Sequence, residues 1–90
     1  MTCDEMRVFG ARLARYLPVV EAQCMRPECY AVRLSIEKLV GAGISIIDAK
    51  IMTALVFAAH KERSDSQNSP LDFEAYLAEL AALTAPAWRD

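Results

Sequence analysis

Cysteine and histidine are the side chains of this sequence that could hold a metal ion or act as nucleophiles, and they lie at Cys3, Cys24, Cys29 and His60. A structural zinc ion takes four such ligands, usually closely spaced along the chain. Cys24 and Cys29 lack the tight C-x-x-C spacing, and His60 has no second ligand one helical turn away. A Cys24–Cys29 disulfide is sterically possible, but three cysteines in a cytosolic chain are more typical of reduced thiols. We therefore expect no metal site and no cofactor.

The single histidine, His60, is the residue at which a general base would first be sought. It falls near the end of a predicted helix, beside Lys61 and Arg63, where a positive charge interacts favourably with the helix dipole. The sequence has no G-x-S-x-G motif, no phosphate-binding glycine loop and no pair of carboxylates with catalytic spacing. These observations predict that the chain is not an enzyme.

The composition is unusually apolar for so short a chain. Of the 90 residues 54% are hydrophobic, against about 45–50% in an average soluble domain, and we treat residues 1–90 as one domain. A chain of this size cannot hide so much apolar surface inside itself, so we expect another chain to cover the surplus. The acidic N-terminus lacks an apolar segment typical of a signal peptide. The abundance of arginine and alanine suggests a bacterial source and, with these features, a cytoplasmic protein.

Neither a membrane nor a nucleic acid is predicted as a partner. A membrane-spanning helix needs about 20 mostly apolar residues, and the longest apolar run is interrupted by Asp48 and Lys50. The net charge is −2, and Arg7, Arg12 and Arg15 spread over about 140° of a helix, as on an ordinary solvated face. The stretch at 43–45 resembles the turn of a helix-turn-helix, but the helix after it is too apolar to read base edges.

The first helix is predicted to begin at Asp4, which can cap it. Its apolar residues recur every three or four positions and form a seam along one side: Met6, Phe9, Leu13, Tyr16 and Val20. Pro18 interrupts this seam, so we expect the helix to kink or restart there.

Residues 27–41 carry two competing periodicities. Apolar residues alternate as in a half-buried strand, at Tyr30, Val32, Leu34 and Ile36. The same stretch has Pro27 at a first helical position and Gly41 at a helix end. Apolar residues then share an arc of about 100°: Cys29, Val32, Ile36, Leu39 and Val40. No other stretch offers a partner strand except the same segment of a second copy. We expect a helix, and the strand remains the alternative for residues 30–36.

The third helix is predicted from Ile46 to Glu62, because Ser45 and Asp48 have the spacing of a capping box. Residues 63–69 are polar and rich in turn formers, which indicates a loop. Ser69 and Asp72 repeat the capping-box spacing, and a fourth helix then runs to a stop at Ala85-Pro86, with its apolar side formed by Phe73, Tyr76, Leu77, Leu80 and Leu83. The fold expected is all-α, a small bundle of three to four helices that forms a dimer.

The third helix has apolar residues on almost every side. One face is bulky and is expected to pack on the other helices of the same chain: Ile47, Ile51, Ala54, Leu55 and Ala58. A flatter face lies opposite and needs cover from elsewhere: Ala49, Met52, Val56 and Ala59. The strip left for water contains Lys50, Thr53 and His60 and is interrupted by Phe57. Helices that are hydrophobic nearly all round are buried, so we expect a homodimer.

The interface residues predicted from these faces are Tyr30 and Leu34 on the second helix and Ala49, Met52, Val56 and Ala59 on the third. Surplus apolar surface without a catalytic set or a DNA-reading face is typical of a protein that binds other proteins. We expect a small regulator, of the antiactivator or inhibitor type, that masks another protein such as a transcription regulator. The alternative is a secretion-type chaperone or assembly partner, which would also expose an apolar groove.

Overall fold

The computed structural model describes residues 2–83, and in this range its regular elements are all helices, joined by turns and loops, without a strand. The elements in chain order are α1 (Cys3–Cys24), the short 3-10 helix η1 (Pro27–Cys29), α2 (Tyr30–Gly41), α3 (Ile46–Ser66) and α4 (Phe73–Ala82). The all-α prediction is confirmed, and residues 30–36 belong to a helix. The dimer stays a prediction. The predicted end of the last helix is wrong, because α4 ends at Ala82 and Leu83 after it is extended, before Ala85 and Pro86, which lie outside the described residues.

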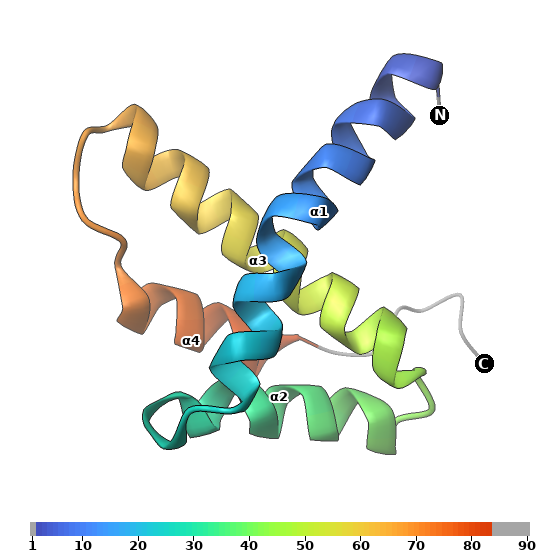
Figure 1. Cartoon of the computed structure of the whole chain (residues 1–90). Helices are drawn as coiled ribbons and strands as arrows, with labels where there is room; N and C mark the ends of the chain where they lie inside the picture. The colour runs from blue at the N-terminus through green and yellow to red at the C-terminus, as the bar shows by residue number, and fades with distance from the viewer. Residues whose placement is uncertain (1, 84–90) are drawn as a thin grey trace.

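Helix α3 lies at the centre of the bundle. Figure 1 shows α1 crossing α3 as the arms of an X, while α2 runs below the crossing and α4 lies beside it. The contact between α1 and α3 is the most extensive in the described part of the chain, and α3 also packs against α2 and α4. This surrounding by three helices explains why an almost wholly apolar helix is stable in so small a domain.

Two predictions about α1 need correction. The helix begins earlier than predicted, because Thr2 rather than Asp4 is the N-cap: its side chain accepts from the Glu5 amide, and the Glu5 carboxylate accepts from the Thr2 amide. Of the two outcomes expected at Pro18, the restart is wrong, because Pro18 lies inside one continuous helix from Cys3 to Cys24, and the kink stays a prediction. Buried contacts on both sides of the proline, at Tyr16 and Val20, hold the helix through it.

The boundary between α3 and α4 also differs from the prediction. Residues 63–66 are helical, so α3 ends at Ser66 and not at Glu62. Ser64 is buried and donates to the His60 carbonyl over 3.0 Å, which ties the extra turn to the helix. The N-cap of α4 is Asp72, whose side chain accepts from the Ala75 amide over 3.0 Å, and not Ser69.

The core is built around aromatic rings. Phe57 of α3 contacts Tyr16 of α1 and Tyr76 of α4 edge to face, with ring centroids 5.8 Å and 5.3 Å apart. Phe73 and His60 pack against the same Tyr76 ring. These rings join α1, α3 and α4, and α2 contributes aliphatic side chains to the same core: Val32, Ile36 and Leu39.

The prediction that a strip of α3 with Lys50, Thr53 and His60 faces water is wrong for two of these residues. Thr53 is fully buried and His60 is 6% exposed, and Phe57 is part of the core rather than an interruption of a wet face. Each polar group is satisfied inside the protein: Thr53 Oγ1 donates to the Ala49 carbonyl over 2.9 Å, and His60 Nε2 lies 3.0 Å from Glu79 Oε1. Conversely Ile47, placed on the packed face, is 66% exposed. Side-chain polarity alone predicted the wrong exposure for Thr53 and His60, because partners within the protein satisfy their polar groups.

Candidate protein-interaction surface

The flatter face predicted on α3 is not a free surface. Ala49 is fully buried and Val56 is 9% exposed, and half-buried Met52 packs against the core of the same chain. Ala59 alone among these four residues is exposed. The prediction that this face needs a second molecule to cover it is therefore wrong for Ala49 and Val56, because the other helices of the chain already do so.

The two residues predicted on α2 are exposed. Tyr30 is 58% and Leu34 is 45% exposed, and they lie one helical turn apart on the side of α2 that faces away from its buried residues, Val32, Ser35, Ile36 and Leu39. The structure brings them together on one surface, and their role in binding stays a prediction.

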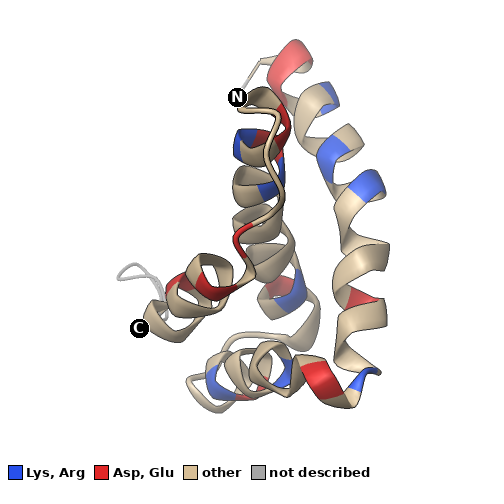
Figure 2. Ribbon diagram, turned by 90° about the vertical axis from the view of Figure 1, so that its left-hand side faces the viewer, with Lys and Arg blue, Asp and Glu red and all other residues tan. Residues whose placement is uncertain are grey.

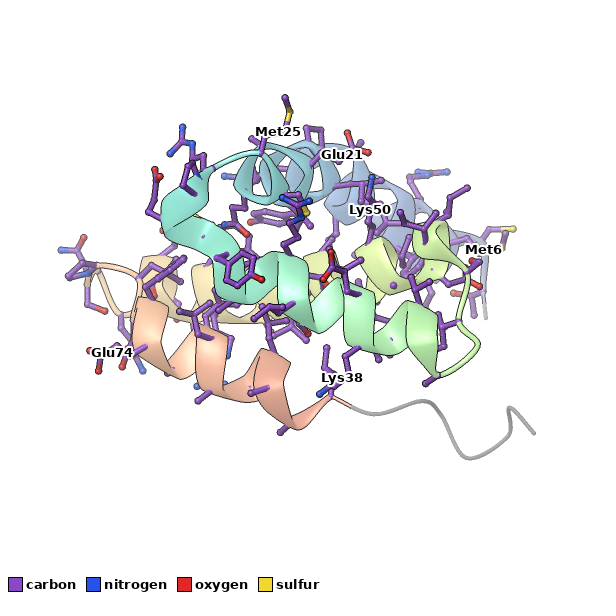
Figure 3. All side chains as sticks on the ribbon, turned by 90° about the horizontal axis from the view of Figure 1, so that it is seen from below. Met6, Glu21, Met25, Lys38, Lys50 and Glu74 are labelled. Carbon is purple, nitrogen blue, oxygen red and sulfur yellow. The ribbon has the colours of Figure 1, made fainter. Side chains whose placement is uncertain are left out.

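A third exposed apolar residue, which lines a groove together with Tyr30, was not predicted. Met25 is 86% exposed and lies in the turn between α1 and η1, where Figure 3 shows it pointing away from the helices. The sequence does contain a signal for it, since Met25 directly precedes the Arg26-Pro27 pair that marks the turn. We use the name α2 surface for Met25, Tyr30 and Leu34 together.

Shallow grooves border the α2 surface on both sides. A groove of about 270 Å³ is lined by Cys24, Met25, Arg26, Pro27, Tyr30 and Arg33. A second groove of about 280 Å³ lies between α2 and α4 and is lined by Ala31, Leu34, Ser35, Lys38, Leu77 and Ala81. Both are open to solvent and mainly apolar, which suits a helix or an extended segment of another protein better than a small molecule enclosed on all sides.

The charged residues that line the two grooves are basic, although exposed Glu28 and Glu37 lie in the same segment. Arg26, Arg33 and Lys38 line the two grooves, and Figure 2 shows basic positions on α2. Arg33 lies 3.6 Å from Glu37 in an exposed ion pair, and Lys38 Nζ donates to the Ala81 carbonyl over 2.8 Å. Exposed Tyr, Met and Arg side chains are the types enriched at the centres of protein interfaces.

The three cysteines and His60 do not form a common site in the described part of the chain. Cys3 is exposed, Cys24 half-buried and Cys29 buried, all as free thiols, and burial raises the pKa of the Cys24 thiol, which disfavours its reactive thiolate. Across residues 2–83 there is no group of three or more His, Cys, Asp or Glu side chains placed to hold a metal ion. His60 is buried and pairs with the half-exposed Glu79, and it does not lie at a helix end, because α3 extends past it.

No helix within the described part of the chain is long and apolar enough to cross a membrane. Comparison of the chain with protein-family models, with curated proteins and with solved structures found no match.

Proposed function

We propose that this protein is a small helical interaction module that binds and masks an apolar surface of another protein, as an antiactivator or inhibitor does. The observation that carries the proposal is the α2 surface: its three large apolar side chains are exposed and line two grooves, Met25 and Tyr30 the first and Leu34 the second, with basic residues at the edges of both. Burying apolar area of this kind contributes about 25 cal/mol per Å², so leaving it in water is unfavourable.

The chemistry of the partner follows from this composition. Tyr30, Met25 and Leu34 would enter an apolar surface, while Arg26 and Arg33 favour carboxylates at its edge. An amphipathic helix with an acidic border fits this description. A transcription regulator masked in this way would lose activity through occlusion, without any covalent chemistry.

The test is capture of the partner by purified protein from the native host, followed by mass spectrometry of what is bound. Tyr30→Asp and Leu34→Asp each place a charge in a desolvated contact and are expected to abolish capture. Val40→Asp is the matched control, since Val40 is 41% exposed on the same helix but on another side, and it should capture normally. Circular dichroism confirms that all three variants remain helical. Equal capture by all variants would place the binding site elsewhere.

A second measurement separates masking from catalysis. His60→Gln removes the imidazole but keeps a polar side chain next to Glu79. On the masking proposal, the folded variant retains activity towards the partner. Loss of activity with normal partner capture would favour an enzyme in its place.

The grooves beside the α2 surface support the chaperone or assembly-partner alternative as a second candidate, because an open apolar groove suits an extended segment. The two candidates differ in the state of the bound protein. A masked regulator stays folded in the complex, whereas a chaperone client does not, and hydrogen exchange of the captured partner distinguishes them.

A further inference from the structure

The N-terminal half of α1 extends beyond the rest of the bundle. We call residues 2–12 the α1 arm. Figure 1 shows it continuing past the crossing with α3 and diverging from α3, which it contacts through the Arg12–Glu62 pair at its base. All residues from 2 to 8 are exposed, including Met6 at 58% and Val8 at 60%. Figure 3 shows Met6 pointing outward. The apolar seam of α1 is thus buried at Tyr16 and Val20, half-buried at Phe9 and exposed at Met6.

One side of the arm forms a shallow groove of about 370 Å³, lined by Asp4, Glu5, Val8, Phe9 and Arg12. The groove is acidic towards its N-terminal end, apolar in its middle and basic towards its other end. Arg12 is held in place by Glu62, with its Nε and Nη2 atoms 3.2 Å and 3.0 Å from the two carboxylate oxygens. The guanidinium has five N–H donors in all, so donors remain for another carboxylate.

Arg15 extends the basic end of this side. It lies three residues after Arg12 and is exposed, with its guanidinium carbon 5.3 Å from the centre of the Tyr16 ring. At 100° per residue Arg15 lies within about 20° of Asp4 and Val8, so all three share one side of the helix.

The order of these charges is self-complementary. Phe9 lies near the middle of two pairs of opposite charges. Glu5 and Arg12 lie four positions before it and three after it, and Asp4 and Arg15 lie five before it and six after it. A second α1 arm running in the opposite direction, with a two-fold axis beside Val8 and Phe9, places Asp4 opposite Arg15 of the other copy. It places Glu5 opposite Arg12 in the same way, and the reverse pairs form by symmetry. The apolar residues of both arms then meet at the axis.

We propose that the α1 arm binds the α1 arm of a second copy of this chain in antiparallel orientation. A parallel arrangement would set like charges against each other. A partner helix of one charge sign would match only one end of the groove, whereas a reversed copy matches both. This surface is separate from the α2 surface, so the proposal goes beyond the proposed masking function, and each can fail without the other.

The size of the contact predicts a weak dimer. The arm has about three helical turns, or roughly 15 Å of helix, and pairing two arms buries less than the roughly 1,200 Å² of a standard interface. We expect a dissociation constant on the order of 10–100 μM.

Sedimentation velocity between about 10 μM and 1 mM, a range that spans this affinity, tests the proposal on the full chain. Arg15→Glu and Asp4→Arg each replace two attractive contacts per dimer with repulsive ones. Each variant alone should dimerise about tenfold more weakly than wild type. An equimolar mixture of the two should associate again. In the mixed dimer Asp4 of the first variant faces Arg15 of the second, and the two substituted side chains, which have opposite charges, face each other.

Arg7→Glu makes the same charge change on another side of the arm and should leave dimerisation as in wild type, while circular dichroism verifies helicity in every variant. A wild type that remains monomeric at about 1 mM, far above the expected dissociation constant, would overturn the proposal. A dimer unaffected by Arg15→Glu would also overturn it, because that dimer would use another face. The same holds if the mixture of the two variants does not associate, because antiparallel pairing of the arms predicts that the mixture dimerises again.

Discussion

At the scale of single residues, the Tyr76 hydroxyl donates to Gln23 Oε1 over 2.9 Å and links α4 to α1 inside the core. Tyr76 is fully buried and Gln23 is 9% exposed. Tyr76→Phe removes the donor and leaves the Gln23 oxygen without a partner, which should lower the free energy of unfolding by about 1–2 kcal/mol at neutral pH. Urea denaturation measures this loss, and Tyr30→Phe, at an exposed tyrosine, should leave stability unchanged.

Burial also raises the pKa of the Tyr76 phenol well above its ordinary value of 10.0. The folded chain then keeps this proton while the unfolded chain releases it at about pH 10. The stability gained from Tyr76 is therefore complete below that pH and falls as the pH rises above it. Urea denaturation at a series of alkaline pH values should show a steeper decline for wild type than for Tyr76→Phe. Parallel declines would contradict the assignment.

At the scale of elements, the cap of α4 decides where the loop ends. Asp72→Ala removes the side chain that accepts from the Ala75 amide and should cost about 1 kcal/mol. Ser69→Ala, at the cap expected from the capping-box spacing, should change stability by no more than about 0.5 kcal/mol. Thermal denaturation compares the two. A larger loss of stability in Ser69→Ala than in Asp72→Ala would show that Ser69, as predicted from the sequence, caps the helix.

Much of the fold could be predicted from the sequence, because helical periodicity and caps are local. Ser45 begins α3 as predicted, with its side chain accepting from the Asp48 amide. The rest depended on tertiary contacts. Nothing local in the sequence shows that Glu79, nineteen residues away, satisfies His60, or that Ala49 and Val56 are buried within the chain. On the α2 surface, Tyr30 and Leu34 could be found from helical spacing, whereas Met25 lies in a turn and is signalled only by the Arg26-Pro27 pair that follows it.

At the scale of the whole molecule, Phe57 joins α1, α3 and α4 through Tyr16 and Tyr76. Phe57→Ala should cost about 3–5 kcal/mol, much of the roughly 5–15 kcal/mol that stabilises a domain. We expect loss of the near-ultraviolet circular dichroism signal and binding of a hydrophobic dye. Ile47→Ala, on the same helix but 66% exposed, should lower stability by about 0.5 kcal/mol or less. If Ile47→Ala proved the more damaging, the orientation of α3 would be wrong.

Helix α4 depends on α2 for its C-terminal end, and this has a kinetic consequence. It has 10 residues, fewer than the roughly 12–15 that make even a good isolated helix marginal. Its last carbonyls accept from Ser35 Oγ and Lys38 Nζ, 45 and 43 residues distant in sequence. We therefore expect α4 to form after the folding transition state. Ser35→Ala should speed unfolding about fivefold for a loss of about 1 kcal/mol and leave the folding rate nearly unchanged. Stopped-flow mixing with urea would detect a slowed folding limb if α4 instead formed early.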